Sequence, residues 1–220
     1  MELRTSSDVV TAAAEELERA LTARLADAER CSLALSGGSS PGPVFERLAA
    51  APLDWERVDV FQVDERVAPD GDDARNLTGQ QVTLLDRVPC RTIPMPVTAP
   101  DLDAAARRYA DALPSELDVV HLGLGDDGHT ASWPPGDPVV DSPRPCELVG
   151  EFNGFRRMTL TPPVINAARA RLMLAYGSAK APMLARWLLR DPDLPVDRVR
   201  RSDTWTFLDQ AAAELLPGSG

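Results

Sequence analysis

The apolar positions of the chain follow two periods, one typical of helices and one typical of buried strands. Residues 7–28 carry apolar side chains three and four positions apart, which predicts a helix with Ser7 as its N-cap. The segment SLALS at 32–36 is a short apolar run, which predicts a buried strand that leads into GGSSP. A helix is expected at 41–50, because Pro41 suits a first helical turn.

The same alternation continues along the rest of the chain. Strands are expected at 58–63, 118–125, 147–151, 157–161, 171–177 and 204–209, and a short extended piece interrupted by prolines at 92–97. Helices are expected at 76–86, 101–113, 162–168, 178–190 and the C-terminus. This order predicts one α/β domain over residues 1–220, with a mostly parallel sheet and helices on both faces. Ligands of such sheets bind beyond the carboxyl ends of the strands, so the loops after residues 36, 63, 125 and 177 are expected to converge.

Composition excludes several classes of protein. The formal net charge of −11 argues against nucleic-acid binding, which needs a concentrated basic face. No apolar run approaches the length of a membrane span, and the first residues lack the apolar centre of a signal peptide. Cys31, Cys90 and Cys146 are odd in number and widely spaced, unlike a disulfide framework or a zinc site. We therefore expect a cytoplasmic protein.

The turn SGGSS, formed by Ser36, Gly37, Gly38, Ser39 and Ser40, is a candidate anion site. Free N–H groups and the positive end of the following helix would meet there, and two glycines would let an anion approach the backbone. No GK[ST] follows, so the turn is not a P-loop for ATP. The alternative is an ordinary turn between a strand and a helix.

Asp64, Glu65 and Arg66 follow the strand expected at 58–63 and begin the loop of residues 64–76. An arginine held between two carboxylates would be preorganised to face a carbonyl oxygen or a phosphate. The alternative is a cluster of solvated charges.

The segment HLGLGDDGHTAS at 121–132 matches G-x-G-x-x-G, the pattern of dinucleotide-binding turns. We discount a dinucleotide, because Asp126 and Asp127 would stand where the pyrophosphate approaches. Pro134 and Pro135 also follow where a long helix should run. The glycines are better explained by a turn that presents a reactive side chain.

That side chain is His129, at the carboxyl end of a strand, where it suits a base near neutral pH. Asp127 would orient it or cap its own turn. His121 lies within the strand and is expected to be a satisfied core residue. No G-x-S-x-G is present, so a serine nucleophile lacks its usual setting.

Lys180 is the single lysine among 23 lysine and arginine residues. It falls in the first turn of the helix expected at 178–190, where the helix dipole disfavours a cation unless an anion lies nearby. A bound phosphate would remove that conflict, so Lys180 is a candidate phosphate ligand. The alternative is a solvated residue on a helix surface.

Several segments, in this order, resemble the 6-phosphogluconolactonase family, which is related to the glucosamine-6-phosphate and galactosamine-6-phosphate isomerases. SGGSSP resembles SGGSTP, DERVAP resembles DER-x-VP, LGLGDDGHTAS is similar to LGMGPDGHTAS, RMTLTPPVINAA resembles RITLTLPVINAA, and YGSAKA is similar to G-x-x-KA. The matching segments lie between residues 36 and 181, and LGLGDDGHTAS is the most specific of them.

The resemblance implies a Rossmann-like α/β fold with no cofactor and no metal. It implies hydrolysis of 6-phospho-D-glucono-1,5-lactone to 6-phospho-D-gluconate in the oxidative pentose phosphate pathway. The substrate is the expected partner, without nucleic acid or membrane, and we expect a monomer or a weak homo-oligomer.

The resemblance also implies roles for single residues. His129 would be the general base that activates water, and Arg66 would contact the substrate. Arg157 and Lys180 would surround the phosphate together with the SGGSS turn. Arg66 would stabilise the oxyanion or hold the phosphate, and Asp64 is expected to position Arg66 or a sugar hydroxyl.

The chain departs from the family pattern at two places. Gln62 and Val63 stand where the family often has an aromatic and a small residue, and WPP at 133–135 replaces Leu-Phe-Pro, so the pocket wall is expected to differ in shape. The deaminase branch typically has glutamate at the position of Pro134 and tyrosine at that of Arg66. Both differences favour the lactonase.

Three alternative functions remain at this point. A deaminase of the same fold would release ammonia from glucosamine 6-phosphate. A non-catalytic sugar-phosphate sensor usually carries a helix-turn-helix ahead of the domain, whereas one continuous helix is expected before the first strand here. A nucleotide-dependent oxidoreductase rests on the glycine pattern alone.

Overall fold

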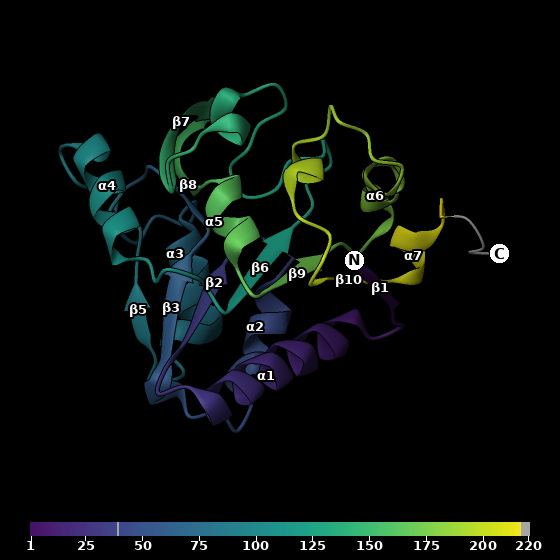
Figure 1. Cartoon of the computed structure of the whole chain (residues 1–220), viewed down its shortest axis with the longest axis horizontal. Helices are drawn as coiled ribbons and strands as arrows, with labels where there is room; N and C mark the ends of the chain where they lie inside the picture. Colours follow the sequence, from purple (N-terminus) through teal and green to yellow (C-terminus); the bar gives the residue numbers. More distant parts are fainter. Residues whose placement is uncertain (39, 217–220) are drawn as a thin grey trace.

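The computed structural model describes residues 1–38 and 40–216, and its main element is a parallel sheet of seven strands (Figure 1). This sheet confirms the predicted α/β fold. Along the sheet, the strands are β1 (Glu2–Thr5), β10 (Thr204–Leu208), β9 (Ala170–Leu174), β6 (Val119–Gly123), β2 (Cys31–Leu35), β3 (Val58–Gln62) and β5 (Arg91–Ile93).

The edge strand β1 is not among the predicted elements. It pairs with β10, and its single apolar side chain, Leu3, is exposed, so hydrophobic periodicity carries no signal there. The four central strands β9, β6, β2 and β3 are neighbours, as the predicted convergence of their loops requires.

Helices cover both faces of the sheet (Figure 1). The helices are α1 (Val9–Asp27), α2 (Gly42–Ala49), α3 (Asn76–Gln80), α4 (Leu102–Ala112), α5 (Pro162–Ala167), α6 (Ala181–Leu188) and α7 (Gln210–Ala213). Short 3-10 turns lie at Trp55–Arg57, Pro138–Asp141, Ser178–Lys180 and Pro195–Arg198. Helices α1 and α2 pack on one face, and α4, α5 and α6 pack on the other.

Burial on both faces explains the continuous apolar runs of the central strands. In β2, Leu33 and Leu35 pack with α1 and α2, whereas Ala34 faces the opposite cluster. In β6, Val120 and Leu122 face the cluster that contains α4 and α6. Neither face of these strands meets water, so they need apolar side chains at consecutive positions.

A second, antiparallel sheet corrects the prediction of a single sheet. It is built from β4 (Asp64–Arg66), β8 (Phe155–Leu160) and β7 (Cys146–Phe152), in that order. The predicted loop of 64–76 therefore begins with a strand. All three residues of this strand are charged, so the sequence carries no apolar pattern there. Backbone pairing with β8 holds the strand in place.

The capping residues of two helices test the predicted starts. Asp8, and not Ser7, is the N-cap of α1, because its carboxylate accepts the Thr11 N–H at 3.0 Å. Asp101 caps α4 as predicted and accepts the Ala104 N–H at 2.9 Å.

Two other predicted helices are interrupted. The helix expected at 76–86 divides into α3 and a π-helical turn at Gln81–Leu85. The helix expected at 178–190 divides into the 3-10 turn Ser178–Lys180 and α6. A proline in its first turn fixes where α6 begins.

All three cysteines are free thiols. Burial raises the pKa of Cys31 and of Cys146 to about 12, so both stay protonated at neutral pH. No helix among the described residues has the length and apolar composition needed to cross a membrane.

Arg171, on β9, is a fully buried arginine that ties three segments together. Its guanidinium donates to the carbonyl oxygens of Ala168 and Ser202, each at 2.6 Å, and to Thr204 Oγ1 at 3.0 Å. Burial is the larger cause and the nearby Arg200 a second one, and together they lower its pKa to about 10. The side chain therefore joins the end of α5 to the loop before β10.

Replacing Arg171 is expected to destabilise the fold strongly. Arg171→Met leaves several buried carbonyl oxygens without a donor, and the free energy of unfolding should fall by roughly 3 kcal/mol or more. The control is Arg198→Met, because Arg198 pairs with Asp141 at 3.1 Å across an exposed surface, and it should cost less than about 1 kcal/mol. Urea unfolding measures both, and equal losses would contradict the role assigned to Arg171.

Candidate active site

A cavity of about 230 Å³ lies at the carboxyl ends of the central strands. Nine of the eleven predicted site residues line it, namely Ser36, Gly37, Gly38, Ser40, Asp64, Arg66, His129, Arg157 and Lys180. Asp127 contacts His129 from outside the cavity lining, and Ser39 lies outside the described residues. The structure therefore brings together residues that are up to 144 positions apart in the sequence, from Ser36 to Lys180.

Asp127 makes both of the contacts that the sequence left as alternatives, one with the His129 ring and one with its backbone. His129 Nδ1 lies 2.5 Å from Asp127 Oδ1, and the same oxygen accepts the His129 backbone N–H at 3.0 Å. Partial burial raises the pKa of Asp127, but the hydrogen bonds from His129 outweigh this effect, so the net pKa is lowered. An ionised Asp127 favours the tautomer with its proton on Nδ1, which leaves the lone pair on Nε2.

The glycines of the GLGDDGH turn serve this histidine. A Cβ on Gly125 would lie 2.1 Å from His129 Nδ1, and the Gly125 N–H donates to the His129 carbonyl at 2.8 Å. Gly128 has φ +85°, a conformation that side chains rarely adopt. The glycine pattern is therefore explained by a tight turn around His129.

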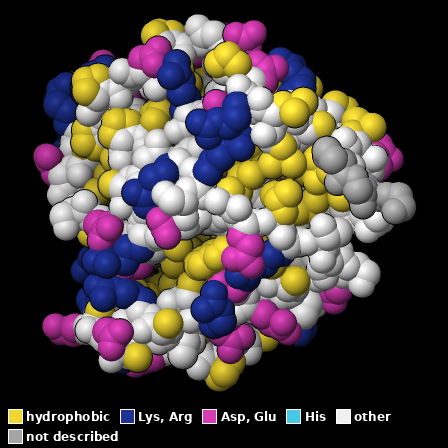
Figure 2. Space-filling model, turned by 45° about the vertical axis from the view of Figure 1, so that its right-hand side comes forward, with side chains coloured by type: hydrophobic (Ala, Val, Ile, Leu, Met, Phe, Trp, Pro, Cys, Tyr) yellow, Lys and Arg dark blue, Asp and Glu magenta, His cyan; other side chains and the backbone are white. Residues whose placement is uncertain are grey.

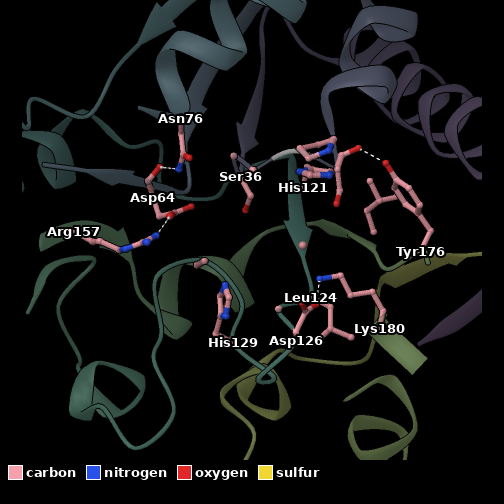
Figure 3. Close-up of a pocket in the computed structure, with 18 of the residues that line it drawn as sticks. Ser36, Asp64, Asn76, His121, Leu124, Asp126, His129, Arg157, Tyr176 and Lys180 are labelled. Atoms are coloured by element: carbon pink, nitrogen blue, oxygen red, sulfur yellow. Dashed lines mark hydrogen bonds and ion pairs between the residues drawn. The ribbon is translucent and has the colours of Figure 1, made fainter. Parts of the chain in front are cut away.

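Asp64 and Arg157 line the side of the cavity away from Lys180 (Figure 3), and both contact Ser132. Ser132 Oγ donates to Asp64 Oδ2 at 2.7 Å, and Arg157 Nη1 lies 4.0 Å from the same oxygen. Burial raises the pKa of Asp64, against the lowering effects of Ser132, Arg66 and Arg157. Burial also lowers the pKa of Arg157, and the positive charge of Arg66 lowers it further.

Arg66 is not held between two carboxylates, which corrects the sequence expectation. Its Nη1 donates to the Ala74 carbonyl at 2.6 Å, and its buried Nε has no hydrogen-bond partner among the described residues. Side chains alternate across a strand, so Glu65 points away from the cavity that Asp64 and Arg66 line.

Glu65 instead fixes the start of α3. Its carboxylate accepts the backbone N–H groups of Asn76 at 2.7 Å and Leu77 at 2.9 Å, and pairs with Arg75 at 3.1 Å. This contact places Asn76, a cavity residue that the sequence reasoning did not single out. Asn76 Nδ2 donates to the Asp64 carbonyl at 2.8 Å, and a Cβ on Gly37 would lie 2.0 Å from Asn76 Oδ1.

Lys180 is the N-cap of α6 and the last residue of a 3-10 turn, one step outside the first helical turn that was expected. Its ammonium group pairs with Asp126, so the nearby anion in this structure is a carboxylate of the chain (Figure 3). Asp126 and Tyr176 both line the cavity and were not among the predicted residues. The Tyr176 hydroxyl donates to the Ser40 carbonyl at 2.6 Å, which attaches the SGGSS turn to the segment before Lys180.

His121 is buried, as expected, but it is not satisfied. Neither ring nitrogen has a hydrogen-bond partner in the described part of the chain, and the ring packs edge-on against Phe45 at 5.1 Å. It lies on β6 beside the cavity, between Ser36 and Tyr176 in Figure 3. Burial lowers its pKa to about 3, so the ring is neutral at physiological pH.

The residues that depart from the family pattern do not line the cavity among the described residues. Trp133 is fully buried and its Nε1 donates to the Leu160 carbonyl at 2.8 Å. Gln62 is buried and binds Glu65 Oε2 at 2.8 Å, while Val63 packs in the core. These side chains therefore do not form part of the pocket wall, and they do not change its shape by direct contact.

The face shown in Figure 2 does not separate charges of one sign from the other. Acidic and basic side chains are interspersed on the face shown in Figure 2, without a continuous basic area. No cluster of three or more His, Cys, Asp or Glu side chains within residues 1–38 and 40–216 is arranged to hold a metal ion.

The comparison with known proteins agrees with this geometry. The model of the family described as glucosamine-6-phosphate isomerases/6-phosphogluconolactonase matches residues 4–208. The chain belongs to this family. It is 36% identical over 214 residues to a 6-phosphogluconolactonase of Synechocystis sp., with 89% of each chain covered. It is 34% identical to a 6-phosphogluconolactonase of Streptomyces coelicolor, with 94% of this chain and 91% of the relative covered.

Solved structures give the same result. The 6-phosphogluconolactonase from Leishmania guyanensis matches with a TM-score of 0.85 and 27% identity over 98% of both chains. A monomeric glucosamine-6-phosphate deaminase matches with a TM-score of 0.85 over 98% of this chain and all of the deaminase, but its 20% identity shows a shared fold alone. The chain is an α/β enzyme of this family.

The unpartnered His121 should make the fold sensitive to acid. Its folded-state pKa of about 3 lies below the ordinary value of 6.5, so the unfolded chain takes up a proton that the folded protein does not. The stability that this group contributes is present above pH 6.5 and is lost as the pH falls toward 3. The loss has a slope of up to about 1.4 kcal/mol per pH unit.

Replacing His121 by leucine should remove this part of the acid sensitivity. Between pH 7 and pH 4.5, the wild type should lose roughly 2–3 kcal/mol more unfolding free energy than His121→Leu. Urea unfolding at the two pH values measures the difference. Parallel losses in both proteins would show that His121 gains a partner in solution.

Proposed function

We propose that the chain hydrolyses 6-phospho-D-glucono-1,5-lactone to 6-phospho-D-gluconate. The observation that carries the proposal is the pairing of His129 with Asp127 at the edge of a cavity that also holds Arg66, Arg157 and Lys180. A base and a set of cations in one small cavity suit a substrate with a carbonyl at one end and a phosphate at the other. The names of the matching relatives support the same reaction.

In the proposed mechanism, neutral His129 acts as the general base. Its Nε2 accepts a proton from a water molecule as the water oxygen bonds to C1 of the lactone, and the carbonyl becomes an oxyanion. The ionised Asp127 stabilises the resulting imidazolium. The C1–O5 bond then breaks, and His129 returns the proton to the departing O5. Acid–base catalysis of this kind contributes about 10²- to 10⁴-fold.

The phosphate is proposed to bind among the SGGSS turn, Arg157 and Lys180. Helix α2 begins directly after this turn, so its unpaired N–H groups and the positive end of its dipole favour an anion there. The pairing of Lys180 with Asp126 has a consequence for this step, because the phosphate must replace that carboxylate at the ammonium group. Asp126 is largely exposed, so its release into water costs little.

Arg66 lines the cavity, and its Nη2 has no hydrogen-bond partner among the described residues, which leaves that group for the substrate. It is proposed to stabilise the oxyanion at C1, and the alternative is a contact with the phosphate. Asp64 is buried and already accepts from Ser132, so we propose that it orients a sugar hydroxyl or Arg66 rather than transferring protons.

His129→Ala tests the reaction and its base together. Freshly made 6-phosphogluconolactone should be hydrolysed by the wild type faster than its spontaneous background, and kcat should fall by about 10²- to 10⁴-fold in the variant. A coupled assay that consumes 6-phosphogluconate measures this, with circular dichroism to verify folding. A wild-type rate in His129→Ala would refute the base, and ammonia release from glucosamine 6-phosphate by the wild type would favour a deaminase.

Lys180→Met and Arg66→Met separate the two ends of the substrate. Loss of a charged hydrogen bond to phosphate should raise KM of Lys180→Met for the phosphorylated lactone by roughly 10- to 100-fold, with a smaller change in kcat. Hydrolysis of unphosphorylated glucono-1,5-lactone should be unchanged in this variant. Arg66→Met should slow both lactones if Arg66 stabilises the oxyanion, and only the phosphorylated lactone if it holds the phosphate.

A further inference from the structure

The hairpin between β7 and β8 carries an aromatic side chain toward the cavity wall. Its turn, FNGF, has Asn153 at φ 50° and Gly154 at φ 80°, the backbone signs of a tight two-residue hairpin. Phe152 and Phe155 face each other across this turn. A register shift between Val149 and Phe152 bends the strand just before the turn, as a β-bulge does.

Phe152 contacts two of the proposed site residues at once. The guanidinium carbon of Arg157 lies 5.1 Å from the centre of the Phe152 ring, and Arg157 Nε donates to the Phe152 carbonyl at 3.0 Å. The His129 ring packs against the same phenyl ring at 5.1 Å with an interplanar angle of 84°. One side chain therefore supports both His129 and Arg157.

The aromatic contact offsets the unfavourable environment of the Arg157 charge. Its guanidinium is buried beside the positive charge of Arg66, and both effects lower its pKa. Its nearest carboxylate oxygen, on Asp64, is 4.0 Å away and already accepts from Ser132. The face of an aromatic ring attracts a guanidinium without using its N–H donors. Arg157 Nη1 reaches Ser132 Oγ at 3.5 Å, so Phe152 stabilises the guanidinium while leaving Nη2 available for a bound anion.

Phe152 also completes the restraint on His129. The contact between Asp127 and Nδ1 restrains the ring through one hydrogen bond at one of its atoms. An edge-on aromatic contact on the same ring adds a second restraint. With both contacts in place, Nε2 keeps one direction relative to the cavity.

We propose that Phe152 is a positioning residue that holds His129 and Arg157 in one fixed arrangement. Phe152 does not line the cavity among the described residues, so it acts through these two side chains. The proposal rests on the proposed function, because it concerns the base and the anion-binding arginine of that reaction. It predicts that loss of the ring affects kcat through His129 and KM through Arg157.

The kinetic test compares Phe152→Leu with Phe155→Leu. Both residues are partly buried phenylalanines of the same hairpin, and of the two it is Phe152 whose ring contacts His129 and Arg157. Phe152→Leu should lower kcat/KM on the order of 10-fold, with a lower kcat and a higher KM, because an aromatic pair and a cation–π contact are lost together. Phe155→Leu should stay within about twofold of wild type, and Phe152→Tyr, which keeps the ring, should restore activity.

A second readout does not depend on activity. The chain has only two histidines, so their Cε1–H signals are resolved by NMR. Loss of the Phe152 ring current should move the His129 signal in Phe152→Leu, and Phe155→Leu should leave it in place. His129→Ala assigns the signal.

The two readouts distinguish the possible failures. If the His129 signal moves but the wild type shows no lactonase activity, the proposed function is rejected, while the contact between Phe152 and His129 is supported. Lactonase activity with equal kinetics in Phe152→Leu and Phe155→Leu would reject the positioning role. If Phe152→Leu does not fold, the more flexible Phe152→Met takes its place, and wild-type kcat and KM in that variant would overturn the proposal.

Discussion

The backbone of Val63 joins the two sheets, and the geometry of the site depends on this junction. Its N–H donates to the Leu35 carbonyl at 2.9 Å in the parallel sheet, and its carbonyl accepts the Leu160 N–H at 2.8 Å in the small sheet. The chain therefore changes sheets within one residue. Backbone hydrogen bonds tolerate little change in length or angle, so Asp64 and Arg66 are fixed opposite Thr159 and Arg157.

An acidic protein that accepts a phosphorylated substrate must separate its charges locally. The net charge is −11, yet each carboxylate near the cavity is engaged with a group of the chain. Asp64 accepts from Ser132, Asp126 pairs with Lys180, and Asp127 binds His129. Glu65 is turned away to the start of α3. Short-range donors thus govern the cavity even though the overall field repels anions.

Hydrophobic periodicity predicted the parallel sheet and its helices, because strands buried on both faces leave a clear apolar signature. The motifs predicted the cavity residues, because the carboxyl ends of neighbouring strands meet at one edge. Periodicity could not reveal β1 or β4, whose places depend on backbone pairing with distant strands and not on apolar side chains. Side-chain direction was equally hidden, so Glu65 and Arg66 were misplaced relative to each other. The contacts of Phe152 could not be predicted from the sequence, because they depend on how the hairpin packs in three dimensions.

The burial of His121 simplifies the interpretation of any titration of this protein. The chain has two histidines, and His121 stays neutral until the pH approaches about 3. The three thiols have raised pKa values, two of them near 12, so none of them ionises around neutrality. His121 and the three thiols therefore contribute no ionisation around neutral pH to a spectrum or a rate profile. Burial of these four side chains thus removes them from the groups that exchange protons under ordinary assay conditions.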